Sequence, residues 1–218
     1  MDQFLGGRSD LVLSALILAL TWPLMVLLGL VIKLDSAGPV FFRQERLGQD
    51  GKPFQILKLR TMIQDAESNG PCWATANDVR VTRAGRVLRK LRIDELPQLY
   101  NILKGEMSFI GPRPEREVFI RGFLEPVPEV REGLRAGDPV GLQVVCRHRE
   151  RVPHYSYRLL VKPGITGWAQ VHHYYAASVE ETKEKLEYDL YYIKNMGFLL
   201  DLAILLKTIR IVLFGRGR

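Results

Sequence analysis

Two adjacent carboxylates, Asp94 and Glu95, are the residues of this chain best suited to chemistry. They follow a basic stretch with Arg86, Arg89 and Arg92, and they stand where a second helix is predicted to begin. A carboxylate among arginines and beside a helix N-terminus is expected to stay ionised, and it can attack phosphorus as in aspartyl-phosphate enzymes. The structural alternative is that Asp94 is an N-cap and Glu95 a first-turn acid, because helix starts favour both residue types.

A second candidate is Arg113, which lies between two prolines in the turn Gly111-Pro112-Arg113-Pro114. Because the prolines restrict the backbone, the guanidinium has few directions in which to point and suits bidentate binding of phosphate. An ordinary tight turn with a solvated arginine is the alternative. Residues 162–171 form a third motif, with a Pro-Gly turn, a second glycine and Trp168. It predicts either a close backbone approach to a ligand near a membrane surface, or a turn followed by a core strand.

Composition restricts the kind of protein that carries these motifs. With 218 residues, 47% of them hydrophobic, the chain suits one compact domain. Lysine and arginine total 31 against 24 acidic residues, so the net charge of +7 favours anionic partners. No nucleic-acid-binding module is recognisable, so phospholipid headgroups or phosphorylated substrates are expected and nucleic acid is not. The only cysteines, Cys72 and Cys146, indicate neither a disulfide framework nor a zinc site.

A charge-free stretch at residues 11–32 predicts contact with a membrane. A straight helix of that length would cover roughly 33 Å, enough to cross a hydrocarbon core. Pro23, preceded by Trp22, lies near its middle and predicts a sharp bend. Arg8 precedes the stretch and several basic residues follow it, so both ends favour the cytoplasm and a re-entrant helix hairpin. A kinked span stays open, and a cleaved signal peptide is disfavoured by the length and by Pro39.

The elements that must position the motifs follow from local patterns. Residues 39–60 predict a β-hairpin around Asp50-Gly51, with Lys58 and Arg60 at the basic end of its second strand. Helices are predicted at residues 82–92, about 95–103 and about 178–195, and residues 63–80 and 122–157 are predicted to be irregular. A last helix at residues 198–214 is predicted to lie at a membrane interface, with a core helix as the alternative.

These elements together predict an α+β fold. Residues 1–36 would form the membrane-inserted, re-entrant helix segment. Residues 37–218 would form a small catalytic domain at the membrane surface, in which the β-hairpin is surrounded by amphipathic and interfacial helices.

Four motifs, in this order and at this spacing, resemble those of the monotopic polyprenyl-phosphate phosphoglycosyl transferases, also called bacterial sugar transferases. The resemblance covers nearly the whole chain and is greatest to the catalytic part of the large exopolysaccharide-type members, so a catalytic core alone is expected. The motifs are Lys58-Leu59-Arg60-Thr61-Met62, Asp94-Glu95-Leu96-Pro97-Gln98-Leu99, Gly111-Pro112-Arg113-Pro114 and Pro163-Gly164-Ile165-Thr166-Gly167-Trp168-Ala169-Gln170-Val171.

The resemblance implies a reaction and a site. A sugar 1-phosphate would pass from a UDP-sugar to polyprenyl (undecaprenyl) phosphate with release of UMP, through an aspartyl-phosphosugar on Asp94. Asp94 and Glu95 would hold Mg²⁺. Substrate phosphates would be bound by Lys58, Arg60, Arg86, Arg92 and Arg113. The enzyme would work at the cytoplasmic face of the bacterial inner membrane, in contact with the phospholipid bilayer, in the first membrane step of polysaccharide or glycoconjugate synthesis. A homodimer is compatible with this interpretation.

The sequence departs from the family pattern in places. Trp22 stands where short members have serine before the proline, Leu59 replaces the usual phenylalanine, and residues 131–157 look like an insertion. The main rival function is a non-catalytic module that binds anionic lipid through its basic helix. That rival predicts that Asp94 is dispensable. The motifs do not identify the sugar.

Overall fold

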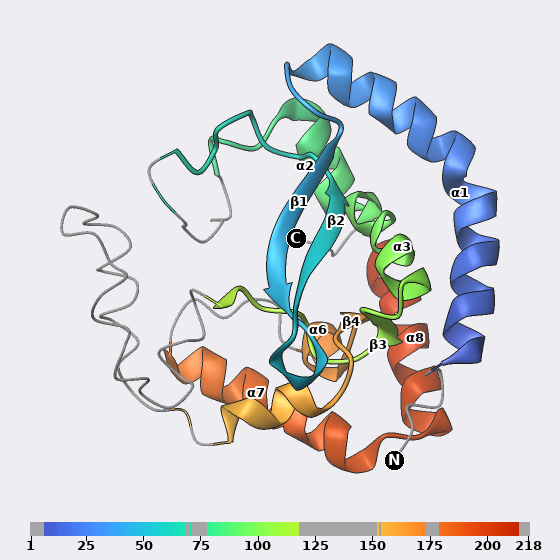
Figure 1. The fold of residues 1–218 in the computed structure, drawn as a ribbon, viewed down its shortest axis with the longest axis vertical. Helices are drawn as coiled ribbons and strands as arrows, with labels where there is room; N and C mark the ends of the chain where they lie inside the picture. The colour runs from blue at the N-terminus through green and yellow to red at the C-terminus, as the bar shows by residue number, and fades with distance from the viewer. Residues whose placement is uncertain are drawn as a thin grey trace.

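The computed structural model describes residues 7–68, 70, 78–117, 152, 154–172 and 179–213. Both cysteines, most of the predicted insertion at 131–157 and the last five residues lie outside these ranges. In the described part, helices and short strands are mixed (Figure 1), as the prediction of an α+β fold requires.

The N-terminal apolar stretch forms one uninterrupted helix, α1 (Arg8–Asp35), with Pro23 inside it. The predicted hairpin of two separate helices is therefore not confirmed, although α1 changes direction along its length (Figure 1). Thr21 Oγ1 donates a hydrogen bond of 2.7 Å to the Ile17 carbonyl in the turn before the proline, and α1 curves around the rest of the molecule (Figure 1). Curvature accommodates the proline ring without ending the helix. By length and composition α1 could cross a membrane.

Both ends of α1 are attached to the same folded domain. Near its start, Asp10 and Ser14 are buried. At its other end, Ile32 is buried with Leu59 of the hairpin, and the Asp35 carboxylate accepts a hydrogen bond of 3.0 Å from the Ala84 backbone N–H. The helix is thus anchored to the domain near both of its ends.

The predicted β-hairpin is confirmed. Strand β1 (Phe41–Leu47) pairs antiparallel with β2 (Pro53–Leu59), and a 3₁₀ turn, η1 (Gln49–Gly51), joins them. Asp50 and Gly51 adopt φ angles of 56° and 70°, the left-handed conformation that an Asp-Gly hairpin turn requires. On β2, Phe54 and Ile56 pack against the helix that follows the candidate carboxylates. The hairpin therefore presents the residues at the end of β2 to those carboxylates.

The two short helices beside the hairpin differ from prediction in one important respect. Helix α2 (Arg83–Lys90) begins at Thr82, whose hydroxyl accepts a hydrogen bond of 3.0 Å from Gly85 N–H. The next helix, α3 (Gln98–Leu103), begins later than predicted. The chain between them forms a separate 3₁₀ turn, η2 (Ile93–Glu95).

The C-terminal part contributes a small parallel sheet and three helices. Strand β3 (Ser108–Ile110) pairs with β4 (Gly164–Thr166). A 3₁₀ segment, η4 (Tyr155–Leu160), precedes β4, and α6 (Trp168–His172) follows it. Helices α7 (Val179–Asn195) and α8 (Phe198–Leu213) match the predicted helices closely.

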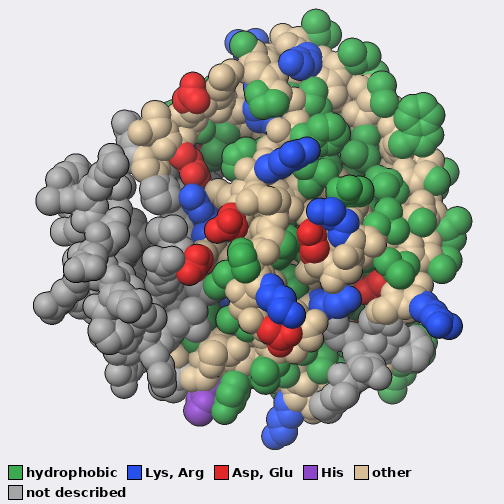
Figure 2. Space-filling view, viewed as in Figure 1, with side chains coloured by type: hydrophobic (Ala, Val, Ile, Leu, Met, Phe, Trp, Pro, Cys, Tyr) green, Lys and Arg blue, Asp and Glu red, His purple; other side chains and the backbone are tan. Residues whose placement is uncertain are grey.

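Exposed apolar side chains concentrate on α1 and α8. On α1 they include Leu20, Trp22 and Leu34, with exposed fractions of 81%, 59% and 89%. On α8 they include Leu199 and Leu206, at 78% and 59%. Figure 2 shows hydrophobic side chains gathered along the side that α1 occupies. A surface of this kind indicates contact with lipid or with another protein.

Candidate active site

The Asp94–Glu95 pair lies in the 3₁₀ turn between α2 and α3. Arg92, immediately before this turn, adopts a left-handed conformation with φ of 56°, which reverses the chain after α2. Both carboxylates are consequently turned inward, with exposed fractions of 8% for Asp94 and 7% for Glu95. Two adjacent acids buried to this degree need compensating partners, because burial disfavours their charged forms.

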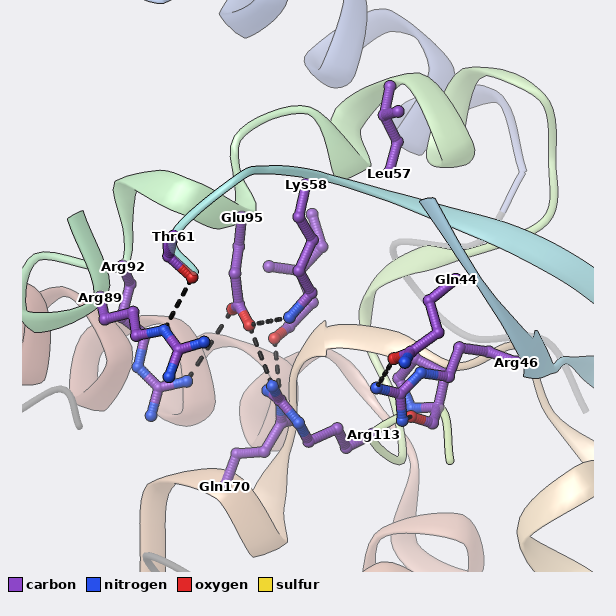
Figure 3. Close-up of polar contacts among 12 residues, drawn as sticks. Gln44, Arg46, Leu57, Lys58, Thr61, Arg89, Arg92, Glu95, Arg113 and Gln170 are labelled. Atoms are coloured by element: carbon purple, nitrogen blue, oxygen red, sulfur yellow. Dashed lines mark hydrogen bonds and ion pairs between the residues drawn. The ribbon is translucent and has the colours of Figure 1, made fainter. Parts of the chain in front are cut away.

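Three cations surround Glu95 (Figure 3). Its Oε1 lies 2.9 Å from Lys58 Nζ and 3.0 Å from Arg113 Nη2, and its Oε2 lies 3.8 Å from Arg92 Nη1. Burial alone would raise the pKa of Glu95, but Lys58, Arg113 and Arg92 outweigh it and hold that pKa well below its usual range. Glu95 therefore stays ionised, and it draws residues from β2, η2 and the Gly111-Pro114 turn to one point.

Asp94 has a different environment. Within the described residues its carboxylate accepts no hydrogen bond and forms no ion pair within 4.0 Å. Burial and the neighbouring Glu95 raise the pKa of Asp94, although Lys58, Arg89 and Arg113 oppose the change. The sequence predicts that surrounding arginines favour the ionised form of Asp94; in the structure, removal from water beside a second carboxylate outweighs them.

The structural alternative for Asp94 is also excluded. The residue before η2 is Arg92 and the residue before α3 is Pro97, and neither helix start is capped by a side-chain hydrogen bond. Asp94 is thus not an N-cap. Its oxygens are available to a ligand or a reacting group.

The structure divides the predicted phosphate-binding residues into two groups. Lys58, Arg92 and Arg113 meet at Glu95. Arg60 does not join them, because it is buried at the end of α1, where it donates to the Ser36 carbonyl at 2.6 Å and to the Ala37 carbonyl. Carbonyls at a helix C-terminus attract cations, which explains this placement.

Arg86 also lies apart from the carboxylate pair, on the exposed face of α2. Its neighbour Arg89 is closer to the site, and its Nε donates a hydrogen bond of 2.8 Å to Thr61 Oγ1 (Figure 3). Of these two arginines of α2, Arg89 therefore belongs to the surroundings of Asp94, and Arg86 lies in solvent.

Two arginines near the site had no recognisable signal in the sequence. Arg46 on β1 donates to the Gln44 Oε1 at 2.6 Å and to the Pro114 carbonyl at 3.2 Å, and burial lowers its pKa to about 10. Arg158 on η4 donates to the Arg113 carbonyl at 3.1 Å, and to Asp189 Oδ2 on α7 at 2.7 Å. Both hold the backbone of the turn that carries Arg113.

The glycines of the Gly111–Pro114 turn and of the motif at residues 163–171 pack against each other. A side chain on Gly111 would clash with the Lys162 carbonyl, and one on Gly164 would clash with the backbone N of Gly111. One on Gly167 would clash with the carbonyl of Gly111. These glycines allow contact between two backbones, and residues 164–166 form a short strand, as the structural alternative predicted. The consequence for the site is a rigid base under Arg113.

Comparison with known proteins adds independent information. The family model described as bacterial sugar transferase matches residues 1–215. A relative from Aeromonas hydrophila, named UDP-N-acetylgalactosamine-undecaprenyl-phosphate N-acetylgalactosaminephosphotransferase, is 44% identical over 98% of this chain. The aligned part is 45% of that relative, so the chain spans less than half of its length.

Two other relatives are similar over most of the chain. One from Caulobacter vibrioides, named UDP-glucose:undecaprenyl-phosphate glucose-1-phosphate transferase, is 41% identical over 92% of the chain and 66% of its own length. An uncharacterized sugar transferase, EpsL, from Bacillus subtilis is 38% identical over 95% of the chain and 87% of its own length. With a family model that matches nearly every residue, this chain belongs to the bacterial sugar transferase family.

Proposed function

We propose that this chain transfers a sugar 1-phosphate from a UDP-sugar to undecaprenyl phosphate and releases UMP. The names of the relatives from Aeromonas hydrophila and Caulobacter vibrioides include this class of donor and acceptor. The observation that carries the proposal is the asymmetry of the carboxylate pair. Glu95 is neutralised by three cations, whereas Asp94, next to it, accepts no hydrogen bond from the described residues.

In the proposed reaction, Asp94 is the nucleophile. An oxygen of its carboxylate bonds to the phosphorus that carries the sugar, and UMP leaves. Lys58, Arg89 and Arg113, whose charges act on Asp94, would offset the negative charge of the phosphate oxygens during the attack. Undecaprenyl phosphate would then attack the aspartyl-phosphosugar and restore the carboxylate. Undecaprenyl phosphate and the UDP-sugar would thus use the same aspartate in turn.

We propose Mg²⁺ as the cofactor of this site. Among the described residues there is no cluster of three or more histidine, cysteine or acidic side chains. Mg²⁺ commonly uses one or two carboxylates and completes its shell with water and substrate phosphate. Asp94, with unoccupied oxygens, and the adjacent Glu95 would supply those carboxylates. When bound, the ion would neutralise charge on the diphosphate.

We also propose that α1 and α8 place the enzyme on the cytoplasmic face of the bacterial inner membrane. Their exposed apolar side chains would lie in lipid, and because both ends of α1 attach to one domain, the helix would enter and leave by the same face. Cysteine introduced at position 4 would test this topology. Labelling of intact cells by an impermeant reagent would contradict it and favour a span.

A covalent adduct tests the proposed chemistry directly. The protein, incubated with UDP-sugar and Mg²⁺ but without undecaprenyl phosphate, should carry a phosphosugar on the peptide that contains Asp94. Asp94→Asn should show no adduct and no UMP release from a panel of UDP-sugars. Asp50→Asn is the matched control, because Asp50 is exposed in the hairpin turn. Full activity of Asp94→Asn would favour the non-catalytic lipid-binding module.

A further inference from the structure

A small hollow lies beside the ion pairs of Glu95. Its polar lining consists of Arg46, Lys58, Gln98 and Arg113, with Ile56 and Pro114 among the apolar residues between them. Each of the four polar side chains carries N–H donors, and three of them are cations. In Figure 3, Arg113 reaches toward Glu95 from the side where Arg46 lies. The hollow therefore shares Lys58 and Arg113 with the ion pairs of Glu95, and its cations suit an anion.

Two donors in this lining are unused. Gln98 has an exposed fraction of 2%, and its Nε2 has no hydrogen-bond partner among the described residues. The Nε of Arg46 is likewise buried without a partner in the described part of the chain. A buried N–H group that lacks an acceptor costs free energy, and such groups are rare in folded proteins. Two of them on one hollow indicate a ligand that brings its own acceptor oxygens.

The cations that line this hollow overlap with those that act on Asp94, because Lys58 and Arg113 belong to both sets. Arg113 acts electrostatically on Asp94 and also on Arg46. The other main charges on Asp94 are Glu95, Lys58 and Arg89, whereas those on Arg46 are Glu115, Arg116 and Glu67. A cationic path thus leads from Asp94 past Lys58 and Arg113 to Arg46.

We infer that this hollow binds the phosphate of the departing UMP, with Arg46 and Gln98 donating to its oxygens; this inference rests on the proposed function. In phosphoryl transfer the attacking and leaving oxygens lie roughly in line, so the leaving group departs away from the nucleophile. As the Asp94 oxygen bonds to the sugar-bearing phosphorus, the bond from that phosphorus to the bridging oxygen breaks. Its electron pair stays on the bridging oxygen, and the added negative charge of UMP meets Arg46, Lys58 and Arg113.

Binding of UMP to the full chain in lipid nanodiscs, measured by calorimetry, tests this assignment without turnover. Gln98→Glu keeps the shape of the side chain but replaces a donor with a carboxylate, so the Kd for UMP should rise by about tenfold or more. Gln55→Glu is the matched control, because it makes the same change on the exposed face of β2 and should alter the Kd less than about twofold. Thermal unfolding checks that each variant is folded.

Gln98→Met and Arg46→Lys provide a second test if Gln98→Glu does not fold. The first removes the amide donor and the second removes the guanidinium fork, so each should weaken UMP binding. Wild-type affinity for UMP in these variants, or no UMP binding by a wild type that turns over, would overturn the assignment and leave the proposed function intact. A wild type that neither binds UMP nor releases it from a UDP-sugar would instead refute the proposed function.

Discussion

Two buried clusters of charged side chains meet the Arg113 turn, and they differ in how fully their polar atoms are used. Around Glu95, Asp94 accepts no hydrogen bond from the described residues and Gln98 Nε2 donates none to them. Around Arg158, Nε donates to Asp189, Nη1 to the Tyr155 hydroxyl at 2.5 Å and Nη2 to the Arg113 carbonyl. The first cluster keeps hydrogen-bonding capacity for a ligand. The second is internally satisfied and holds the first in place.

Charge compensation is similar in the two clusters, because each holds a glutamate whose pKa is lowered and an aspartate, Asp94 or Asp189, whose pKa is raised mainly by burial. In the Arg158 cluster, burial alone would raise the pKa of Glu115, but Lys185 and Arg158 lower it to about 2. In the Glu95 cluster the pKa of Asp94 is raised, by burial and by Glu95. The two aspartates differ in their contacts: Asp189 accepts a hydrogen bond from Arg158 Nε, whereas Asp94 accepts none from the described residues.

The largest expected effect comes from Asp94→Asn. Loss of the nucleophile should lower UMP release by about a thousandfold or more. The melting temperature should stay the same or rise, because a buried charge is removed. The sign follows from the raised pKa of Asp94. In the wild type, the free energy of unfolding falls as the pH rises from the pKa of Asp94 in the unfolded chain, about 4, through its higher pKa in the folded chain, whereas the variant has no such carboxyl group. A variant that loses activity and unfolds together would contradict the contrast between the clusters.

Arg158→Met should have the next largest effect, and on stability rather than on chemistry. It leaves Asp189 and Glu115 without their shared cation, at a cost of about 3–5 kcal/mol. For a chain of this size we expect the melting temperature to fall by about 10 °C. Arg43→Met on the exposed face of β1 is the matched control, with an expected change within about 0.5 kcal/mol. Equal melting temperatures for the two variants would argue against a supporting role for the Arg158 cluster.

The pH dependence of turnover should report the first cluster alone. Because the pKa of Asp94 is raised, kcat/KM should increase with pH through a value above the ordinary aspartate range. Added Mg²⁺ favours the ionised carboxylate, so it should move this increase of kcat/KM to lower pH. If kcat/KM instead increased with pH around the ordinary aspartate pKa, and Mg²⁺ did not change this, the raised pKa of Asp94 would not control the reaction.

The smallest expected effect is that of Arg86→Gln, which tests the boundary of the first cluster. Arg86 is exposed on α2, so kcat/KM and the melting temperature should change little, by less than about twofold and about 1 °C. Arg92→Gln removes one partner of Glu95 and should lower kcat/KM more than Arg86→Gln does. A larger loss from Arg86→Gln would extend the site along α2.

The sequence by itself determined the elements whose causes are local. Asp50-Gly51 between apolar strands sufficed for the hairpin, and amphipathic periodicity sufficed for α2. A capping box at residues 178–181 predicted α7, and the apolar content of residues 198–214 predicted α8. The order and spacing of the motifs sufficed to identify the family, and they make Asp94 and Glu95 the candidate site. These features depend on a few neighbouring residues, which is why a single chain without a structure reveals them.

Tertiary structure alone decided how those residues meet. Pro23 does not divide α1 into two helices, because a domain supports α1 at both ends. Arg60 donates to carbonyls at the end of α1 and does not join Lys58 and Arg113. Arg46 and Gln98 reach one hollow from separate elements, with no shared pattern in the sequence. The raised pKa of Asp94 depends on burial and on Glu95. Burial and long-range contact are properties of the packed chain, so no local pattern could predict them.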